Sequence, residues 1–265
     1  MNRPIWLSAP QGLRMLYILH RLATSPWRKK WPYISERIIA IIIVRDLYSN
    51  LTPLVSEFCR QGIQAKNIWL IDTGSTSREC LKTLKNLSGM GCKLIKPEGE
   101  EHKSGPYIAW LNGDIRKSIR KLDYPFLLTD PDLAFKVNTP TDWLEKAFDT
   151  LMKHAYVTKV GLPLCTEGID KMLYESVQKN QNDLYQHWFF RRLNAITMKK
   201  TKGHICATDT TLALYRPKTP FSTFAIRLAF DYSLKHLPWH STYRNSTEFK
   251  YYCDHKLQSF GEWSR

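Results

Sequence analysis

Residues 124–133 read YPFLLTDPDL, an apolar run that ends in two aspartates one residue apart, Asp130 and Asp132. The run has the length and composition of a buried strand, and the aspartates follow where that strand ends. Open α/β sheets bind ligands at the carboxyl ends of their strands, so both carboxylates are expected at a binding edge. Mg²⁺ is commonly held by one or two carboxylates together with substrate phosphates. The stretch therefore predicts a metal–diphosphate site, with a simple Asp-Pro-Asp turn as the alternative.

The sequence before this stretch alternates between strand-like and helix-like patterns. Residues 38–44 read IIAIIIV, a continuous run typical of a central parallel strand that is buried on both faces. Such alternation predicts right-handed βαβ crossovers and a mostly parallel sheet. In chain order we expect a strand at 38–44, a helix from Leu51 that stops at Gly62, a strand at 67–72, a helix at 78–87, a strand at 92–95, a helix at 106–122 and the strand into Asp130.

Beyond Asp132 the alternation loosens. A helix should begin at Thr139 and Pro140, which suit the N-cap and first helical positions. Residues 159–164 read as a strand, 173–194 as a helix, and 205–215 as a strand pair or one bent strand. We expect one domain, 38–265, with an elaborated second half.

Composition narrows the class of protein. The chain has 265 residues and a net charge of +15, which favours polyanionic or phosphate-bearing partners. No apolar run approaches the ~20 residues that span a bilayer. The six cysteines show no paired spacing, which argues against a zinc site or a disulfide framework. We therefore expect a cytoplasmic protein.

Residues 1–37 resemble a basic, aromatic N-terminal extension with a net charge of +6. A basic amphipathic helix within it could lie on an anionic membrane surface, which would make the protein peripheral to a membrane. The alternative is that the extension packs on the domain and leaves its basic face in water.

Carboxylates follow several of the expected strands. Asp46 comes after the first strand, Asp72 after the second, and Asp130 and Asp132 after a later one. Carboxylates gathered at one sheet edge repel each other unless a cation or hydrogen-bond donors compensate, so the pattern indicates a site. The chain contains neither of the common glycine-rich phosphate loops, so metal and basic side chains would have to hold phosphate.

Three segments together resemble the GT-A glycosyltransferases, especially the family 2-like group. Residues 71–76 (IDTGST) are similar to that group's Asp-x-Gly-Ser-Thr-Asp segment, with Ser77 in place of the final Asp. Residues 105–113 (GPYIAWLNG) are similar to its Gly-x-x-x-Ala-Arg-Asn-x-Gly helix, with Trp110 in place of the Arg and Asn112-Gly113 offset by one. Asp130-Pro131-Asp132 stands where the group has its DxD motif.

The resemblance implies a GT-A-like, Rossmann-like α/β fold and a nucleotide-sugar-dependent enzyme of the hexosyltransferase type. Residues 38–135 would form the nucleotide-sugar half and 136–265 the acceptor half. Asp130 and Asp132 would bind Mn²⁺ or Mg²⁺ and the diphosphate of a UDP- or GDP-sugar. Asp46 and Asp72 would contact the nucleotide. The acceptor would be a glycan or lipid-linked glycan, which the basic charge allows to be anionic, and no specific nucleic acid is expected.

The catalytic base has several candidates in the second half. Inverting members of the resembled group use an acidic residue there, and Asp209 is the first choice. Its alternative role is to bond neighbouring threonine hydroxyls in a turn. Glu248 is a second candidate and Asp170 a third.

Other residues complete the expected donor site. His236 could be a third metal ligand, as in some GT-A enzymes, or a packed side chain beside Trp239. Lys103, just before Gly105, could neutralise donor phosphate or lie solvated in a loop.

Two other functions fit parts of the pattern. A metal-dependent nucleotidyltransferase would also place Asp-x-Asp after a strand. A non-enzymatic nucleic-acid-binding protein would explain the charge and the aromatic N-terminus, yet not the carboxylates at strand ends. An inactive transferase fold is the third possibility.

Overall fold

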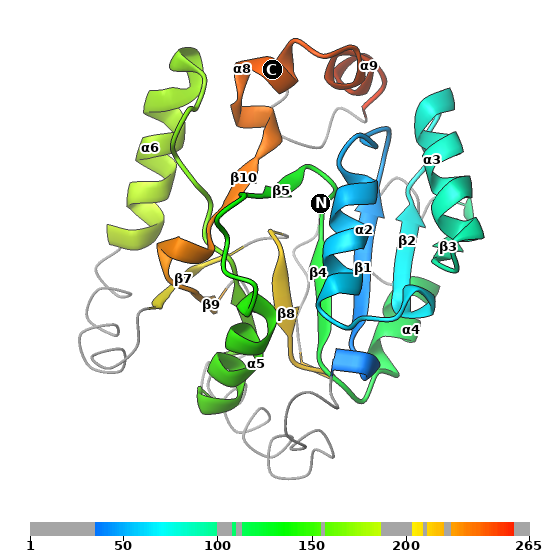
Figure 1. Cartoon of the computed structure of the whole chain (residues 1–265), viewed down its shortest axis with the longest axis horizontal. Helices are drawn as coiled ribbons and strands as arrows, with labels where there is room; N and C mark the ends of the chain where they lie inside the picture. Colours follow the sequence, from blue (N-terminus) through cyan, green and yellow to red (C-terminus); the bar gives the residue numbers. More distant parts are fainter. Residues whose placement is uncertain are drawn as a thin grey trace.

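The structure is a computed structural model that describes residues 35–99, 108–109, 113–154, 157–186, 203–208, 211–219 and 224–256. An eight-stranded mixed sheet runs through the molecule in the order β3-β2-β1-β4-β8-β6-β9-β7 (Figure 1). A second sheet contains only β10 and β5.

The first half of the sheet is parallel. Strand β1 lies at its centre and pairs in parallel with β2 on one side and β4 on the other. The elements of this half are η2 Ser35–Arg37, β1 Ile39–Val44, α2 Leu51–Arg60, η3 Ala65–Asn67, β2 Ile68–Asp72, α3 Arg78–Gly89, β3 Lys93–Ile95, α4 Asp114–Arg120, β4 Phe126–Thr129 and β5 Leu133–Phe135. The predicted α/β class, with a mostly parallel sheet flanked by helices, is confirmed.

The second half of the sheet mixes directions. Strand β8 is antiparallel to both β4 and β6, whereas β6 and β9 are parallel. The elements of this half are α5 Trp143–Lys153, β6 Lys159–Gly161, α6 Lys171–Gln186, β7 His204–Ala207, β8 Ala213–Tyr215, β9 Phe224–Arg227, η5 Phe230–Tyr232, β10 Leu234–His236, η6 Leu237–Trp239, α8 Ser241–Arg244 and α9 Thr247–His255.

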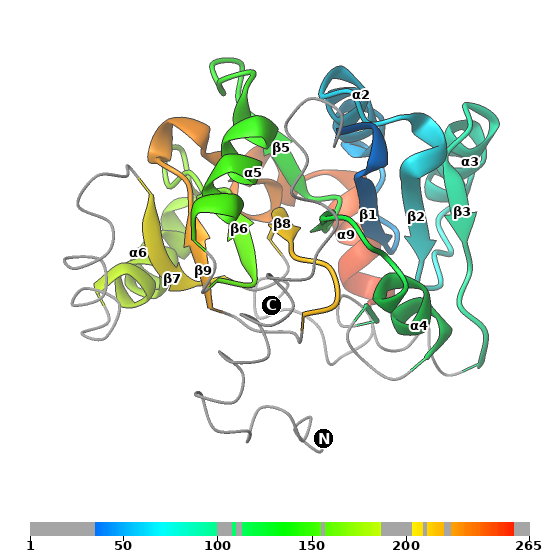
Figure 2. The ribbon, with the colours of Figure 1, turned by 90° about the horizontal axis from the view of Figure 1, so that it is seen from below.

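Apolar side chains cover both faces of the sheet. Along β1, Ala40, Ile42 and Val44 join the core under α2, α3 and α5, while Ile41 and Ile43 join the core under α4. Figure 2 shows α2, α3 and α5 on one side of the sheet and α4 on the other. This arrangement explains why β1 is a continuous apolar run: both of its faces are buried.

The small sheet places the second aspartate beside a distant histidine. Strand β5 begins directly after Asp132, and β10 pairs with it antiparallel, so that His236 lies opposite Leu133. The backbone N–H of Leu237 donates to the carbonyl of Asp132 at 2.8 Å, which extends this pairing. Residues a hundred positions apart are thereby brought together.

Several expected boundaries are wrong. The helix expected at 106–122 begins only at Asp114, because Ile108 and Ala109 form a turn and Gly113 is extended with φ 169°. Thr139 is not an N-cap: its Oγ1 accepts the Lys136 N–H at 3.0 Å, and α5 starts at Trp143 after Asp142.

The stretch expected to be a strand pair or one bent strand, residues 205–215, contributes to two strands, β7 and β8, which do not pair with each other. Within the described ranges, no helix has the length and apolar character that crossing a bilayer requires. The extension expected at 1–37 lies outside the described residues except for η2.

The core under α2 and α5 gives a stability prediction. Phe58 is fully buried on α2, with its ring centroid 6.3 Å from that of Trp143 on α5. Phe58→Ala should lower the free energy of unfolding by about 3–5 kcal/mol, because it removes apolar contact and leaves a cavity. Urea denaturation measures this. Met90→Ala, at a side chain that is 65% exposed, should change it by less than about 0.5 kcal/mol; equal losses in both variants would contradict this packing.

Candidate functional site

Three loops meet at the carboxyl edge of the parallel strands. They follow β1, β2 and β4, which are neighbours in the sheet, and α9 lies across the same end (Figure 1). Asp46 follows β1, Asp72 is the last residue of β2, and Asp130 and Asp132 follow β4. The parallel pairing therefore brings Asp46, Asp72, Asp130 and Asp132 to one edge, as the sequence predicts.

Asp46 organises the loop that follows β2. Its Oδ1 accepts the backbone N–H groups of Thr76 and Ser77, each at 2.7 Å, and its own N–H donates to Ser75 Oγ at 3.0 Å. Asp46 is only 1% exposed and has φ +53°, a backbone conformation that asparagine and aspartate adopt more readily than most residues. These bonds give Asp46 a structural role in this loop, and its contact with a nucleotide stays a prediction.

Asp72 shapes the same loop from its other end. Its Oδ1 accepts the N–H groups of Gly74 at 3.2 Å and Ser75 at 2.7 Å, which closes a tight turn after β2. Its Oδ2 lies 3.8 Å from Nζ of Lys96, a largely exposed side chain at the end of β3. Lys96 is a cation at this edge that sequence patterns did not single out.

The Asp130–Asp132 loop is held by the start of α2. Asn50 Nδ2 donates to the carbonyl oxygens of Pro131 at 3.2 Å and Leu133 at 2.6 Å. Asn50 therefore fixes the backbone on both sides of Asp132. The two aspartate side chains are half-buried.

Asp132 faces His236 across the small sheet. Asp132 Oδ2 lies 3.3 Å from His236 Nε2, and both side chains are about 15% exposed or less. Two atoms bound at about 2.1 Å to one ion, at a right angle, would lie about 3.0 Å apart. The observed separation fits two adjacent ligand positions of one cation.

Asp132 and His236 alone do not form a complete metal-binding site. Within the described ranges, no three His, Cys, Asp or Glu side chains gather closely enough to hold an ion by themselves. Asp130 thus does not form a three-ligand set with Asp132 and His236. A cation bound here would need further oxygen ligands, which a diphosphate could supply.

Glu248 ties α9 to the loop after β1. Its Oε1 accepts the backbone N–H groups of Tyr48 and of Ser49, the latter at 3.0 Å, and its side chain is 6% exposed. Tyr243 also hydrogen-bonds to this carboxylate. Glu248 was predicted as a candidate base, but its contacts favour a structural link between α9 and the donor edge.

Tyrosines from the C-terminal helices line this edge, and sequence reasoning missed them. Tyr251 Oη lies 3.0 Å from Thr76 Oγ1, within the loop that Asp46 holds. Burial raises the pKa of Tyr252, and the nearby carboxylates of Asp132 and Asp130 raise it further. Burial, followed by Glu248 and Asp132, likewise raises the pKa of Tyr243. Both phenols therefore stay protonated and can donate hydrogen bonds at neutral pH.

Three predicted site residues lie outside the described residues: Asp209, Lys103 and Gly105. The chain that follows Asp209 enters β8 at the same edge of the sheet. Ala213 pairs with Leu128, two residues before Asp130, and the Leu212 carbonyl accepts the Leu162 N–H at 3.1 Å. Asp170, the third candidate base, bonds through its N–H to the Trp239 carbonyl at 2.7 Å.

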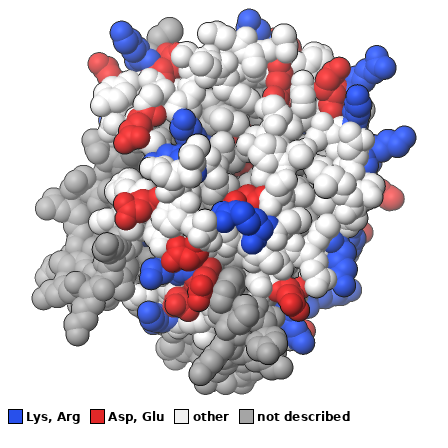
Figure 3. Space-filling model, in the orientation of Figure 1, with Lys and Arg blue, Asp and Glu red and all other residues white. Residues whose placement is uncertain are grey.

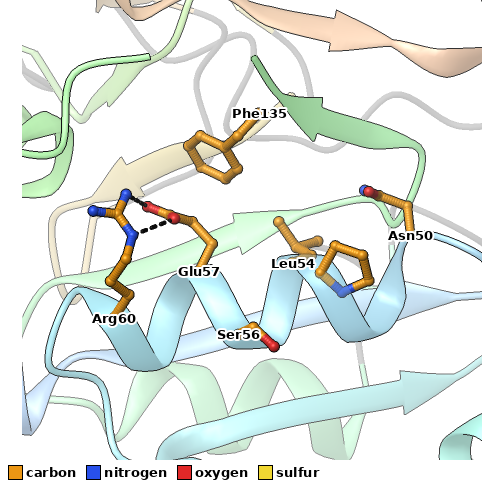
Figure 4. A pocket seen from close by; sticks show the side chains of 7 residues that line it. Asn50, Leu54, Ser56, Glu57, Arg60 and Phe135 are labelled. Atoms are coloured by element: carbon orange, nitrogen blue, oxygen red, sulfur yellow. Dashed lines mark hydrogen bonds and ion pairs between the residues drawn. The ribbon is translucent and has the colours of Figure 1, made fainter. Parts of the chain in front are cut away.

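A pocket lies between α2 and Phe135 of β5 (Figure 4). It is lined by Asn50, Pro53, Leu54, Ser56, Glu57, Arg60 and Phe135. The Glu57 carboxylate is already bound by Arg60 and by Trp143 Nε1, the latter at 2.6 Å. The pocket therefore offers no uncommitted carboxylate for chemistry.

Surface charge is unevenly distributed. In Figure 3, basic side chains gather along the side of the molecule formed by α3. Exposed Arg78, Lys82 and Lys85 lie on α3, and exposed Lys93 and Lys96 on or next to the edge strand β3. Lysines on an edge strand also discourage pairing with another sheet, so they do not by themselves indicate a partner.

Comparisons with known proteins found similarity among solved structures. A mannosyltransferase of Pyrobaculum calidifontis, in complex with GDP-Man and Mn²⁺, is 13% identical with a TM-score of 0.47, over 94% of this chain and 70% of that one. Glucosyl-3-phosphoglycerate synthase of Mycobacterium tuberculosis, in complex with Mn²⁺, UDP-glucose and phosphoglyceric acid, is 12% identical with a TM-score of 0.38. This chain covers 62% of that synthase, less than two thirds of its length, over 81% of its own. No protein-family model and no curated protein sequence matches the chain.

The contacts of Glu248 give a prediction that separates its two roles. Glu248→Ala should lower the free energy of unfolding by about 1–3 kcal/mol, because two backbone N–H groups lose their acceptor. Glu248→Gln retains an acceptor oxygen and should lose less than about 1 kcal/mol. Thermal and urea unfolding measure both, with Asp254→Ala at an exposed position of the same helix as the matched control. Equal free energies of unfolding for Glu248→Ala and the control would show that the hydrogen bonds of Glu248 do not stabilise the fold.

Proposed function

We propose that the protein is a metal-dependent glycosyltransferase that moves a sugar from a nucleotide-diphosphate sugar to a hydroxyl acceptor. One observation carries the proposal: the loops after β1, β2 and β4 bring four aspartates to one sheet edge, where Asp132 Oδ2 and His236 Nε2 lie 3.3 Å apart. Ligands of open α/β sheets bind at this edge. A concentration of carboxylates there suits a cation together with an anionic ligand.

The described residues would have different roles in such a site. Asp132 and His236 would hold Mn²⁺ or Mg²⁺, and Asp130 would contact the nucleotide sugar or complete the metal's ligands through water. When bound, the cation would supply Lewis-acid stabilisation of the negative charge on the leaving diphosphate. Asp46 and Asp72 shape the loop beside the nucleotide through their backbone hydrogen bonds. Asn50 holds the loop that carries Asp132 against the start of α2.

The acceptor hydroxyl needs a base within hydrogen-bond reach. Asp209 remains the proposed base, since the chain after it enters β8 beside β4, the strand that ends directly before Asp130. Glu248 is less suited, because backbone N–H groups already occupy its buried carboxylate. The proposed acceptor class is a glycan or lipid-linked glycan, and the proposed donors are UDP- and GDP-sugars. We also propose that the enzyme acts in the cytoplasm and that residues 1–37 contact a membrane surface.

Nucleotide binding gives the direct test of the proposal. With Mn²⁺, one class among UDP-, GDP-, CMP- and dTDP-sugars should raise the melting temperature, because it binds only the folded state. At a hundred times its dissociation constant the ligand adds about 2.7 kcal/mol, or several degrees for a chain of this size. Asp132→Ala should abolish the shift, whereas Asp149→Ala, at an exposed position on α5, should retain it.

The outcomes also separate the rival functions. A shift with no nucleotide class would count against the proposal, and so would a shift that Asp132→Ala leaves intact. The proposed transferase reaction should give a product with a new glycosidic bond and should release a nucleoside diphosphate. A product that retains the nucleotide would identify a nucleotidyltransferase instead.

The imidazole of His236 predicts a metal preference. Imidazole is a softer ligand than carboxylate and water, which suit Mg²⁺ best, so the wild type should bind donor more tightly with Mn²⁺ than with Mg²⁺. His236→Ala should reduce this preference several-fold while leaving metal-dependent binding through Asp132. Isothermal titration of the nucleotide with each metal measures the ratio. His240→Ala, whose Nδ1 lies 2.8 Å from the Gly168 carbonyl oxygen, is the matched control; an unchanged ratio in His236→Ala would exclude a ligand role.

A further inference from the structure

Arg45 occupies a central place at the donor edge, although no sequence motif marks it. It directly follows β1, the strand that pairs with both β2 and β4. Val44 lies level with Asp72, and Ile42 lies level with Thr129. Arg45 therefore emerges between the loop of Asp72 and the loop of Asp130 and Asp132.

One nitrogen of Arg45 is anchored. Its Nη1 donates to the carbonyl oxygen of Thr73 at 2.7 Å. Thr73 is itself fixed to the end of β1, since its N–H and its Oγ1 both bond the Val44 carbonyl, at 2.9 and 3.0 Å. The guanidinium is thus held in a defined position, and this anchor uses one of its five N–H groups.

The surroundings of Tyr252 place Arg45 with the two aspartates. Burial is the main cause that raises the pKa of Tyr252; Asp132 and Asp130 raise it further, and Arg45 lowers it. One phenol therefore lies within electrostatic reach of all three charged groups. Arg45, Asp130 and Asp132 therefore each lie near enough to the phenol of Tyr252 to act on its charge.

A second nitrogen of Arg45 has no acceptor. Its Nε is buried and makes no hydrogen bond within the part of the chain that the structure describes. Nor does an ion pair join Arg45 to a carboxylate among those residues. Buried donors are almost always paired in folded proteins, so an unpaired one indicates a ligand or water.

We propose that Arg45 binds the diphosphate of the donor, on the same edge as Asp132. The proposal rests on the function proposed above and adds a residue to it. A planar guanidinium presents parallel N–H groups that match two phosphate oxygens, and it keeps its charge at every physiological pH. Arg45 would offset the carboxylates that surround the site and would neutralise charge that grows on the diphosphate as the sugar leaves. Tyr252, protonated beside it, could donate a further hydrogen bond.

Titration calorimetry with three probes tests the proposal: inorganic pyrophosphate, the nucleoside diphosphate and the corresponding nucleoside, each with Mn²⁺. Arg45→Gln should weaken pyrophosphate and nucleoside diphosphate about tenfold or more, because charge-assisted contacts to phosphate are lost. Nucleoside binding should not change. Arg45→Lys retains the positive charge but lacks the parallel N–H groups of a guanidinium. Its affinity for pyrophosphate and nucleoside diphosphate should therefore lie between those of the wild type and Arg45→Gln. Arg60→Gln, in the surface pair with Glu57, is the matched control.

A measurement on the wild type covers the case in which Arg45→Gln does not fold. Phenylglyoxal modifies accessible arginines, and mass spectrometry locates each site. Pyrophosphate with Mn²⁺ should protect Arg45 and leave Arg60 reactive. Modification of Arg45 at the same rate with and without pyrophosphate would overturn the proposal.

The outcomes distinguish this inference from the proposed function. Loss of binding in Asp132→Ala with unchanged binding in Arg45→Gln would remove Arg45 from the site and leave the transferase proposal standing. Arg45-dependent pyrophosphate binding without binding of any sugar nucleotide would support the anion site and contradict the transferase. Absence of both kinds of binding in the wild type would overturn both.

Discussion

The parallel pairing of β1 with β2 and β4 is the constraint on which the site depends. Parallel neighbours end at the same edge of a sheet, so residues that follow them meet however far apart they are in sequence. The register places Val44 beside Asp72 and Ile42 beside Thr129. Because both faces of β1 are buried, a shift of one residue would exchange its two apolar faces and misplace all three loops.

Carboxylates crowded at one edge are tolerated because they have different tasks. Asp46, Asp72 and Glu248 each accept backbone N–H groups and fix the loops between them. Asp132 instead faces His236, and Asn50 holds its loop by the backbone alone. The first group holds the loops of the edge together, and the second would bind the cation of the proposed function.

Sequence patterns predicted the elements with strong periodicity and missed those without it. The apolar run of β1, the helical spacing of α2 and the strand into Asp130 were all recognisable, because buried faces impose a period on apolar residues. Helix α9 was missed: it is short, and only Glu248 and Phe249 are buried in it. The start of α4 was misplaced, because Gly113 interrupts a helix that apolar spacing alone would extend back to Pro106.

The sequence by itself determined the α/β class and the set of aspartates at strand ends. Both follow from local properties of the chain, namely the spacing of apolar residues and the points where apolar runs end. Only the tertiary structure decided which of them share a task. The pairing of β5 with β10 brings His236 to Asp132, α9 brings Glu248 to the backbone of Tyr48 and Ser49, and the end of β1 places Arg45 between two loops. Such contacts join residues about 30 to 200 positions apart, and their geometry follows from packing and strand pairing, which no local pattern records.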